Sequence, residues 1–397
     1  CNEIIDDTLN PPNNLALLWK PGSELGKPLK PYSETNSTLV NATIHKMIEY
    51  NGELYIGGDF QVIGGQIIPY LAKWDGTNWS PVAQVNGPVE DMIVFQGKLL
   101  IQVDEIEFPQ GIYDYNKIYI LDGGSLSEVQ ANIDWVIAPT YAISPFEGGV
   151  GRSEQWTVHD NKLFMYIKIN EFDALSWSNH TDDGFALAWW DGGEFWHSGE
   201  YFCRGEAEFE YYHGVLKSFN GELFCTKRSI NNSVELGLFK FDGNFNIIHP
   251  CNNLPRWENV TGNTLGEPKI YTLEEYNNNL LVGGDFETIG GIQASNIAAY
   301  NGNSWSVFGN WPFETYELKV FNNKLYASFF FGNFNGIDAE RIASFNGNTW
   351  DSLLFNLSEF DIPSDGNKNT IQLYQNHLYF GGNNTSAVTN NFIKLEQ

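Results

Sequence analysis

The densest group of aromatic residues in the chain lies between positions 189 and 212, and its residue types suit ligand or partner binding. Trp and Tyr combine a broad apolar ring with one polar group, so they can stack on a sugar face and also donate a hydrogen bond. The residues of this group are Trp189, Trp190, Trp196, Tyr201, Phe202, Tyr211 and Tyr212. Glycan capture is one interpretation. The alternative, favoured by their strand-like positions, is packing inside a β fold.

Two acidic residues end a repeated Gly-Gly-Asp-Phe motif, Asp59 in one copy and Asp285 in the other. Calcium takes six to eight oxygen ligands, and neither motif supplies an Asp-x-Asp-x-Asp loop around its single carboxylate. We therefore predict a structural role, in which the carboxylate accepts hydrogen bonds from loop amides. No metal and no cofactor is predicted.

Familiar catalytic patterns are missing from the sequence. The seven histidines show no His-Glu-x-x-His spacing, and neither a Gly-x-Ser-x-Gly elbow nor a phosphate-binding glycine loop occurs. We predict that the protein is not an enzyme. A carboxylate pair for glycoside hydrolysis remains an open alternative, because sequence alone cannot set the separation of two side chains.

A repeated hairpin unit must position all these residues. Asn51-Gly52 lies between the apolar runs 44–50 and 54–56, and Asn-Gly in this setting predicts a tight hairpin, because the turn needs positive φ. Similar turns recur at Gln96-Gly97, Asp160-Asn161, Asn220-Gly221, Asn277-Asn278, Asn322-Asn323 and Gln375-Asn376. A second turn follows most of them, at Asp75-Gly76, Asp122-Gly123, Asp191-Gly192, Asp242-Gly243, Asn301-Gly302 and Asn346-Gly347.

This pattern predicts an all-β chain folded as a seven-bladed β-propeller of four-stranded antiparallel blades. The last unit, near 392–395, has no fourth strand behind it. We therefore expect an N-terminal strand to close the ring, either Leu15–Trp19 or a segment near 25–29. The predicted organisation is a flexible tether over 1–14 and a single propeller domain over 15–397.

The residues of the two best copies resemble a known group. The run Leu-Tyr-Ile-Gly-Gly-Asp-Phe followed by Ala-Lys-Trp-Asp-Gly-Thr-Asn-Trp is similar to the kelch-like propeller repeats of secreted and surface proteins in Gram-negative bacteria. The resemblance implies the fold. It implies little about function, since such propellers have many unrelated roles.

Three cysteines remain besides Cys1, and in an exported protein an odd count suggests one disulfide and one free thiol. Cys225 lies in an alternating run and is predicted to be a buried small apolar residue. Cys203 and Cys251 follow Gly193 and Gly243 by ten and eight residues, so both are expected at the same rim. We predict a Cys203–Cys251 disulfide.

Composition limits the choice of partners. The net charge is −27, with 49 acidic and 22 basic residues, and such a surface repels phosphate backbones and anionic lipid heads. Nucleic-acid binding is therefore not expected. Extra residues at 104–116, 131–154, 170–184 and 252–268 are predicted to be rim loops that enlarge a binding face.

Residue 1 is cysteine, as in a mature bacterial lipoprotein, and the polar segment behind it suits a tether. We therefore predict lipidation of Cys1 and an outer-membrane location, with the cell surface favoured over the periplasmic face. The predicted function is that of a non-catalytic scaffold in an envelope complex, with an outer-membrane barrel or a secretion or uptake channel as partner. Surface glycan binding is the first alternative, and a carbohydrate-active enzyme is the second.

Overall fold

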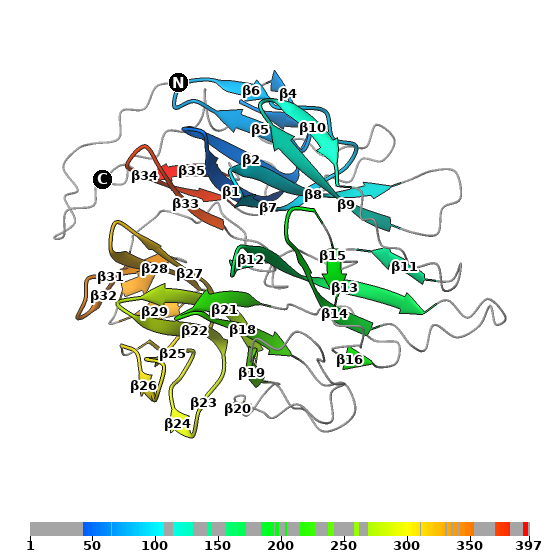
Figure 1. Cartoon of the computed structure of the whole chain (residues 1–397). Helices are drawn as coiled ribbons and strands as arrows, with labels where there is room; N and C mark the ends of the chain where they lie inside the picture. Colours follow the sequence, from blue (N-terminus) through cyan, green and yellow to red (C-terminus); the bar gives the residue numbers. More distant parts are fainter. Residues whose placement is uncertain are drawn as a thin grey trace, which may run out of the picture.

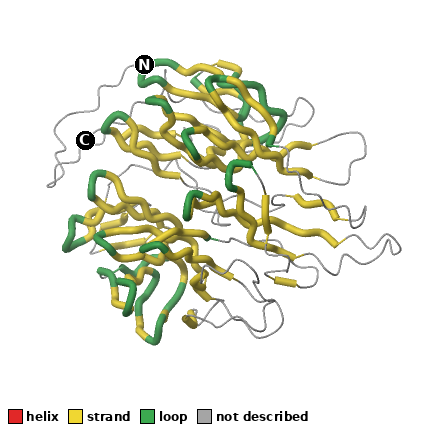
Figure 2. The backbone as a smooth tube through the Cα atoms, in the orientation of Figure 1, coloured by secondary structure: helices red, strands yellow, loops and turns green. Residues whose placement is uncertain are grey.

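The computed structural model describes residues 43–64, 66–106, 114–129, 141–144, 156–171, 184–193, 195–197, 203–204, 215–227, 237–241, 258–261, 269–309, 311–329, 332–334, 337–339, 342–352, 370–381 and 392–395. These residues form antiparallel strands joined by turns and loops (Figures 1 and 2). The chain is all-β and folds as a β-propeller of small antiparallel sheets, as the sequence predicted. No helix with the length and apolarity to cross a membrane occurs within these ranges.

Five sheets contain a complete four-stranded meander. The first comprises β1 (Thr43–Tyr50), β2 (Glu53–Asp59), β5 (Leu71–Trp74) and β6 (Trp79–Pro81). The second comprises β7 (Val89–Phe95), β8 (Lys98–Ile106), β9 (Asp114–Asp122) and β10 (Ser125–Glu128). The third comprises β12 (Trp156–His159), β13 (Lys162–Glu171), β14 (Gly184–Trp190) and β15 (Phe195–His197).

The other two complete meanders lie later in the chain. One comprises β21 (Lys269–Tyr276), β22 (Asn279–Asp285), β25 (Ile297–Tyr300) and β26 (Trp305–Val307). The other comprises β27 (Thr315–Phe321), β28 (Lys324–Phe329), β31 (Ile342–Phe345) and β32 (Trp350–Ser352).

Two further sheets depart from the predicted unit. One begins with β17 (Leu216–Phe219), β18 (Glu222–Lys227) and β19 (Gly237–Phe241), and continues through β20 (Glu258–Thr261) to β23 (Thr288–Ile289) and β24 (Ile292–Gln293). The last comprises β33 (Thr370–Tyr374), β34 (His377–Gly381) and β35 (Phe392–Leu395). The prediction of seven complete four-stranded blades is therefore wrong in number: five are shown, the β17–β24 sheet continues past its fourth strand into β23 and β24, and the last sheet has three strands within the described ranges. Both candidate closing segments, 15–19 and 25–29, lie outside the described residues.

The remaining strands either form short hairpins between the strands of a sheet or add to the third sheet. Two short hairpins follow the second strands of their sheets: β3 (Val62–Ile63) with β4 (Gln66–Ile67), and β29 (Gly332–Phe334) with β30 (Ile337–Ala339). In the third sheet, β11 (Tyr141–Ser144) and β16 (Cys203–Arg204) add to the meander. Each segment that was predicted to be a rim loop therefore contains some strand residues. The β8–β9 and β13–β14 hairpins are long as a result.

The predicted hairpin turns are confirmed. In the seven turns of the Asn51-Gly52 type, the first residue has a positive φ of 46–51°. These residues are Asn51, Gln96, Asp160, Asn220, Asn277, Asn322 and Gln375. Asn, Asp and Gly tolerate this region better than other residues, which is why the motif appears in the sequence.

The hydrophobic core lies between neighbouring sheets. Ile44 and Met47 of the first sheet pack with Tyr374 and Tyr379 of the last sheet. Separate clusters join the first sheet to the second, the second to the third, and β21–β26 to β27–β32. Burying each such side chain contributes about 1.5–3 kcal/mol, so no sheet is stable without its neighbours.

The first strands of the sheets lie side by side around one axis (Figure 1). β1 contacts β7 on one side and β33 on the other, and β21 contacts β17 and β27. Side chains of these strands that point away from the cores therefore gather at the axis.

Candidate functional site at the axis

Four first strands carry an irregularity at the same place. The strand register shifts between Ile44 and Lys46, and equivalent shifts occur in β7, β21 and β27. Each shift inserts one residue into the strand, and the inserted residues are His45, Glu90, Tyr271 and Tyr316. A β-bulge of this kind redirects a side chain and is frequent beside functional sites.

Glycine makes the first bulge possible. Gly58 pairs with Ile44, and a Cβ added to Gly58 would contact the carbonyl oxygen of Thr43 and approach the Ile44 Cα to 2.9 Å. Only glycine leaves room for the backbone here. This explains the second glycine of the Gly-Gly-Asp-Phe motif.

The bulged residues of β1 and β7 form a polar pair. The His45 Nδ1 lies 2.9 Å from the Val89 carbonyl oxygen and 3.2 Å from the Glu90 Oε1. Because both neighbours are acceptors, Nδ1 carries the proton and donates. An imidazole hydrogen-bonded to a carboxylate is a combination that general acid–base chemistry uses.

The bulged residues of β21 and β27 form a second pair of a different kind. The Tyr271 hydroxyl donates a 2.8 Å hydrogen bond to the Glu314 Oε1. The Tyr271 and Tyr316 rings lie 5.3 Å apart between centroids, tilted by 34°. This pair offers an oriented carboxylate beside aromatic rings.

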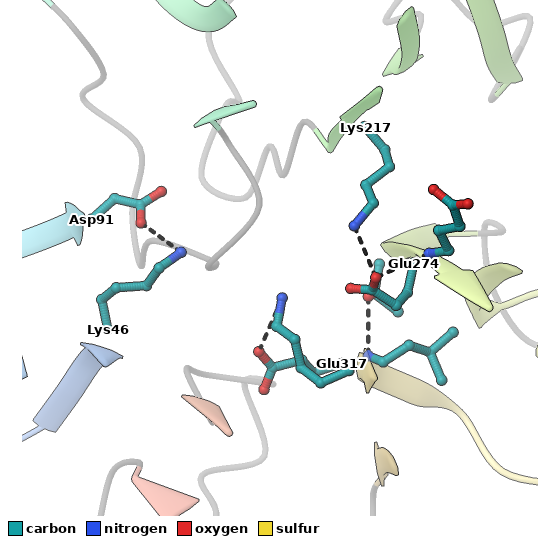
Figure 3. Close-up of polar contacts among 9 residues, drawn as sticks. Lys46, Asp91, Lys217, Glu274 and Glu317 are labelled. Carbon is teal, nitrogen blue, oxygen red and sulfur yellow. Dashed lines mark hydrogen bonds and ion pairs between the residues drawn. The ribbon is translucent and has the colours of Figure 1, made fainter. Parts of the chain in front are cut away.

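Deeper along the axis, lysines and carboxylates form ion pairs (Figure 3). Lys46 Nζ lies 2.8 Å from Asp91 Oδ1, Lys217 Nζ lies 2.9 Å from Glu274 Oε1, and Lys319 Nζ lies 3.8 Å from Glu317 Oε1. In Figure 3, Lys46 and Asp91 lie on one side, and Lys217, Glu274 and Glu317 lie on the other. A buried carboxylate is strongly unfavourable without a partner, so each lysine stabilises the carboxylate beside it.

Sequence reasoning did not single out these pairs, although a signal for them exists. Lys217, Glu274 and Lys319 each precede the first residue of their hairpin turn by three positions. Lys46, Asp91 and Glu317 precede theirs by five positions. The charged residues lie at fixed distances from the turns. This spacing indicates that they share one side of the first strands, the side that faces away from the core.

The aromatic group predicted to bind a ligand is only partly described. Trp189 and Trp190 lie in β14 and are 7% and 6% exposed. Trp189 packs on Phe164 at 6.0 Å, and Trp190 packs on Phe95 at 5.6 Å. Their burial agrees with the core-packing alternative.

Of the other aromatic residues in this group, only Trp196 lies within the described residues. Trp196 lies in β15, whose backbone pairs with β14. Tyr201, Tyr211 and Tyr212 lie outside the described residues, so a binding role for the group stays a prediction.

The two predicted aspartates of the Gly-Gly-Asp-Phe motifs lie at strand ends. Asp59 and Asp285 end β2 and β22, where the backbone pairs with Thr43 and Lys269. The described ranges contain no group of three or more His, Cys, Asp or Glu that could hold a metal.

The cysteines have mixed outcomes. Cys225 is buried in β18, as predicted. Cys203 lies in β16, whereas Cys251 and Cys1 lie outside the described residues. The disulfide and the lipidation therefore stay predictions.

No protein-family model matches the chain, and no curated protein sequence matches it. Among solved structures, the polysaccharide lyase Uly1 is similar at 9% identity and a TM-score of 0.48, over 96% of this chain and 98% of that one. A Pyrococcus horikoshii acylaminoacyl peptidase is similar at 8% identity and a TM-score of 0.47, over 90% and 51%. A Trypanosoma rangeli sialidase is similar at 12% identity and a TM-score of 0.42, over 86% and 58%.

These similar structures are enzymes, and this finding corrects the prediction that the protein is not an enzyme. The prediction rested on the absence of short motifs. Functional groups contributed by separate strands leave no short motif in a sequence, so that absence excludes no activity. At 8 to 12% identity, the similarity concerns the fold and does not specify a reaction.

Proposed function

We propose that the protein binds a carbohydrate at the bulged end of its axis. The observation that supports this proposal is the set of four bulges, which place His45, Glu90, Tyr271 and Tyr316 at equivalent points of four first strands. Imidazole and carboxylate groups exchange hydrogen bonds with sugar hydroxyls, and tyrosine rings can pack against sugar faces.

The connections also favour this end of the strands. β8 and β13 extend beyond the register of the bulges, so the long hairpins of the second and third sheets project on this side. Side chains on rigid strands would then form the floor of the site, with the hairpins beside it.

The experiment compares two buried tyrosines that each donate one hydrogen bond. The Tyr271 hydroxyl lies at the bulged end, whereas the Tyr50 hydroxyl donates to the Gly97 carbonyl oxygen at 3.1 Å, at the turn end. Glycan arrays would identify a retained oligosaccharide, and calorimetry would measure its affinity for Tyr271→Phe and Tyr50→Phe.

We expect Tyr271→Phe to weaken binding about fivefold, because Glu314 loses the donor that orients it. Tyr50→Phe should leave the affinity unchanged. Retention of no carbohydrate by the folded protein, or equal weakening by both variants, would overturn the proposal.

A second candidate is cleavage of the bound carbohydrate. What favours it is the pair of His45 and Glu90, whose Nδ1 and Oε1 lie 3.2 Å apart, together with the buried carboxylate of Asp91, the next residue along β7. If cleavage occurs, chromatography should detect shorter products, and Asp91→Asn should abolish their release while binding persists. Unchanged oligosaccharide after prolonged incubation would leave binding alone as the function.

We also propose that an N-terminal strand completes the last sheet, which has three strands within the described ranges. Leu15–Trp19 and the segment near 25–29 are the candidates. Deleting residues 1–29 should lower the unfolding temperature by several degrees, since an exposed strand edge and its apolar face would be left uncovered. An unchanged unfolding temperature would contradict this. The kelch-like relationship, the envelope partner and the outer-membrane location stay predictions.

A further inference from the structure

The three axial ion pairs share an asymmetry. Lys46 is 15% exposed and its partner Asp91 is 3% exposed. Lys217 is 26% exposed against 12% for Glu274, and Lys319 is 23% exposed against 3% for Glu317. In every pair the side chain of the lysine is more exposed than that of its carboxylate partner.

This arrangement contrasts with the rest of the chain. The protein carries 49 acidic and 22 basic residues, yet the accessible charges of these axial pairs are ammonium groups. The buried carboxylates hold the lysine ammonium groups in place through these contacts. The long-range field of a protein with charge −27 would repel an anion, but salt screens that field beyond about 8 Å at physiological ionic strength. Direct contact therefore dominates for an anion close to the lysines.

We infer that the ligand carries a carboxylate, and that it is an acidic saccharide whose uronate group approaches the axial lysines. This inference rests on the proposed carbohydrate site. A neutral sugar hydroxyl can accept a hydrogen bond from an ammonium group, but it gains no attraction between opposite charges. A carboxylate gains charge-assisted hydrogen bonds, which are roughly twice as strong as neutral ones.

The test uses pairs of probes that differ only in charge. Oligosaccharides of galacturonate, glucuronate and mannuronate are measured beside the same chains with their carboxylates reduced to alcohols. We expect the intact protein to bind one acidic form about tenfold more tightly than its reduced form. We also expect this preference to decline as salt concentration rises.

Variants then locate the effect. Lys217→Met combined with Glu274→Gln removes one axial pair without leaving a buried charge, and it should reduce the preference by at least about threefold. Glu274→Gln alone keeps the lysine, so it should retain the preference. The control is Lys98→Met, which removes an exposed lysine paired with Asp122 at 3.1 Å near a hairpin turn. It should change nothing.

The outcomes separate the two proposals. If reduced and acidic forms bind equally, or if the Lys217→Met and Glu274→Gln double variant keeps the full preference, the inference is wrong and carbohydrate binding stands. If no form of any probe binds and the glycan arrays are also blank, both proposals fail.

Discussion

The two ends of the first strands belong to the same repeat, but different features recur from sheet to sheet at each end. At the turn end, backbone and side-chain contacts both recur: the Tyr50 hydroxyl donates to Gly97 O at 3.1 Å, and the Tyr374 hydroxyl donates to Gly52 O at 2.9 Å. At the bulged end, only the backbone irregularity recurs. The inserted residues include an imidazole, a carboxylate and two phenols.

The turn end therefore contributes mainly to stability, and the bulged end supplies side chains of different chemical types. Contacts that repeat between sheets hold the ring of strands together, so the turn end has little freedom to vary. The bulged end keeps the geometry that aims a side chain at the axis and leaves its chemical type open. We therefore expect variants at the turn end to change stability, and side-chain variants at the bulged end to change binding.

The largest effect should come from the glycine opposite the first bulge. Gly58→Ala adds a Cβ that meets backbone atoms, with Ile44 Cα at 2.9 Å, so the bulge must deform. We expect a loss of about 2–3 kcal/mol in the free energy of unfolding, measured with urea. The matched change is Gly97→Ala in a turn, where φ is +75° and no atom lies within 4 Å. It should lose only about 1 kcal/mol. Equal losses would show that the bulge adapts to a side chain.

An intermediate effect should come from the tyrosines at the turn end. Tyr374→Phe and Tyr50→Phe each remove one hydrogen bond between sheets and should each lose about 1 kcal/mol of unfolding free energy. Similar losses would mean that the last and first sheets are joined as firmly as the first and second. A negligible loss for Tyr374→Phe alone would indicate a loose junction.

The smallest effect concerns acid stability at a second turn. Hydrogen bonds from the backbone N–H groups of Asn78 and Thr77 hold the pKa of Asp75 below its usual range. The contribution of Asp75 is therefore present above the carboxyl's ordinary pKa and is lost as pH falls through the lowered value.

The matched variant is Asp75→Asn, because Asn301 accepts the same two hydrogen bonds at its own turn without titrating. The variant should lose slightly less stability than the original protein between about pH 4 and pH 2. Thermal unfolding at each pH measures this difference. Parallel curves for the two proteins would contradict the assignment.

Local chemistry made the hairpins predictable. Asn51-Gly52 and its relatives impose positive φ through their own backbone preferences, so the turns could be placed from sequence. The burial of Cys225 followed from strand alternation in the same way.

Features that depend on distant partners could not be predicted. The pairing of Val260 in β20 with Ile289 in β23 joins strands of two successive repeat units, and no nearby residue specifies it. The Lys217–Glu274 pair spans 57 positions, so only the register of two separate strands brings it together. The His45–Glu90 pair was missed for the same reason, since its two residues belong to different strands.

The contact between the first and last sheets also has a consequence for biosynthesis. Gln375 donates a 3.2 Å hydrogen bond to the Asp75 carbonyl oxygen across 300 positions, and Tyr374 shares a core cluster with Ile44. On the ribosome, the first sheet must wait for almost the whole chain before this face is covered. Long-range closure of this kind slows folding and leaves apolar surface exposed meanwhile. Newly made chains should therefore depend on chaperones until residues 370–381 emerge.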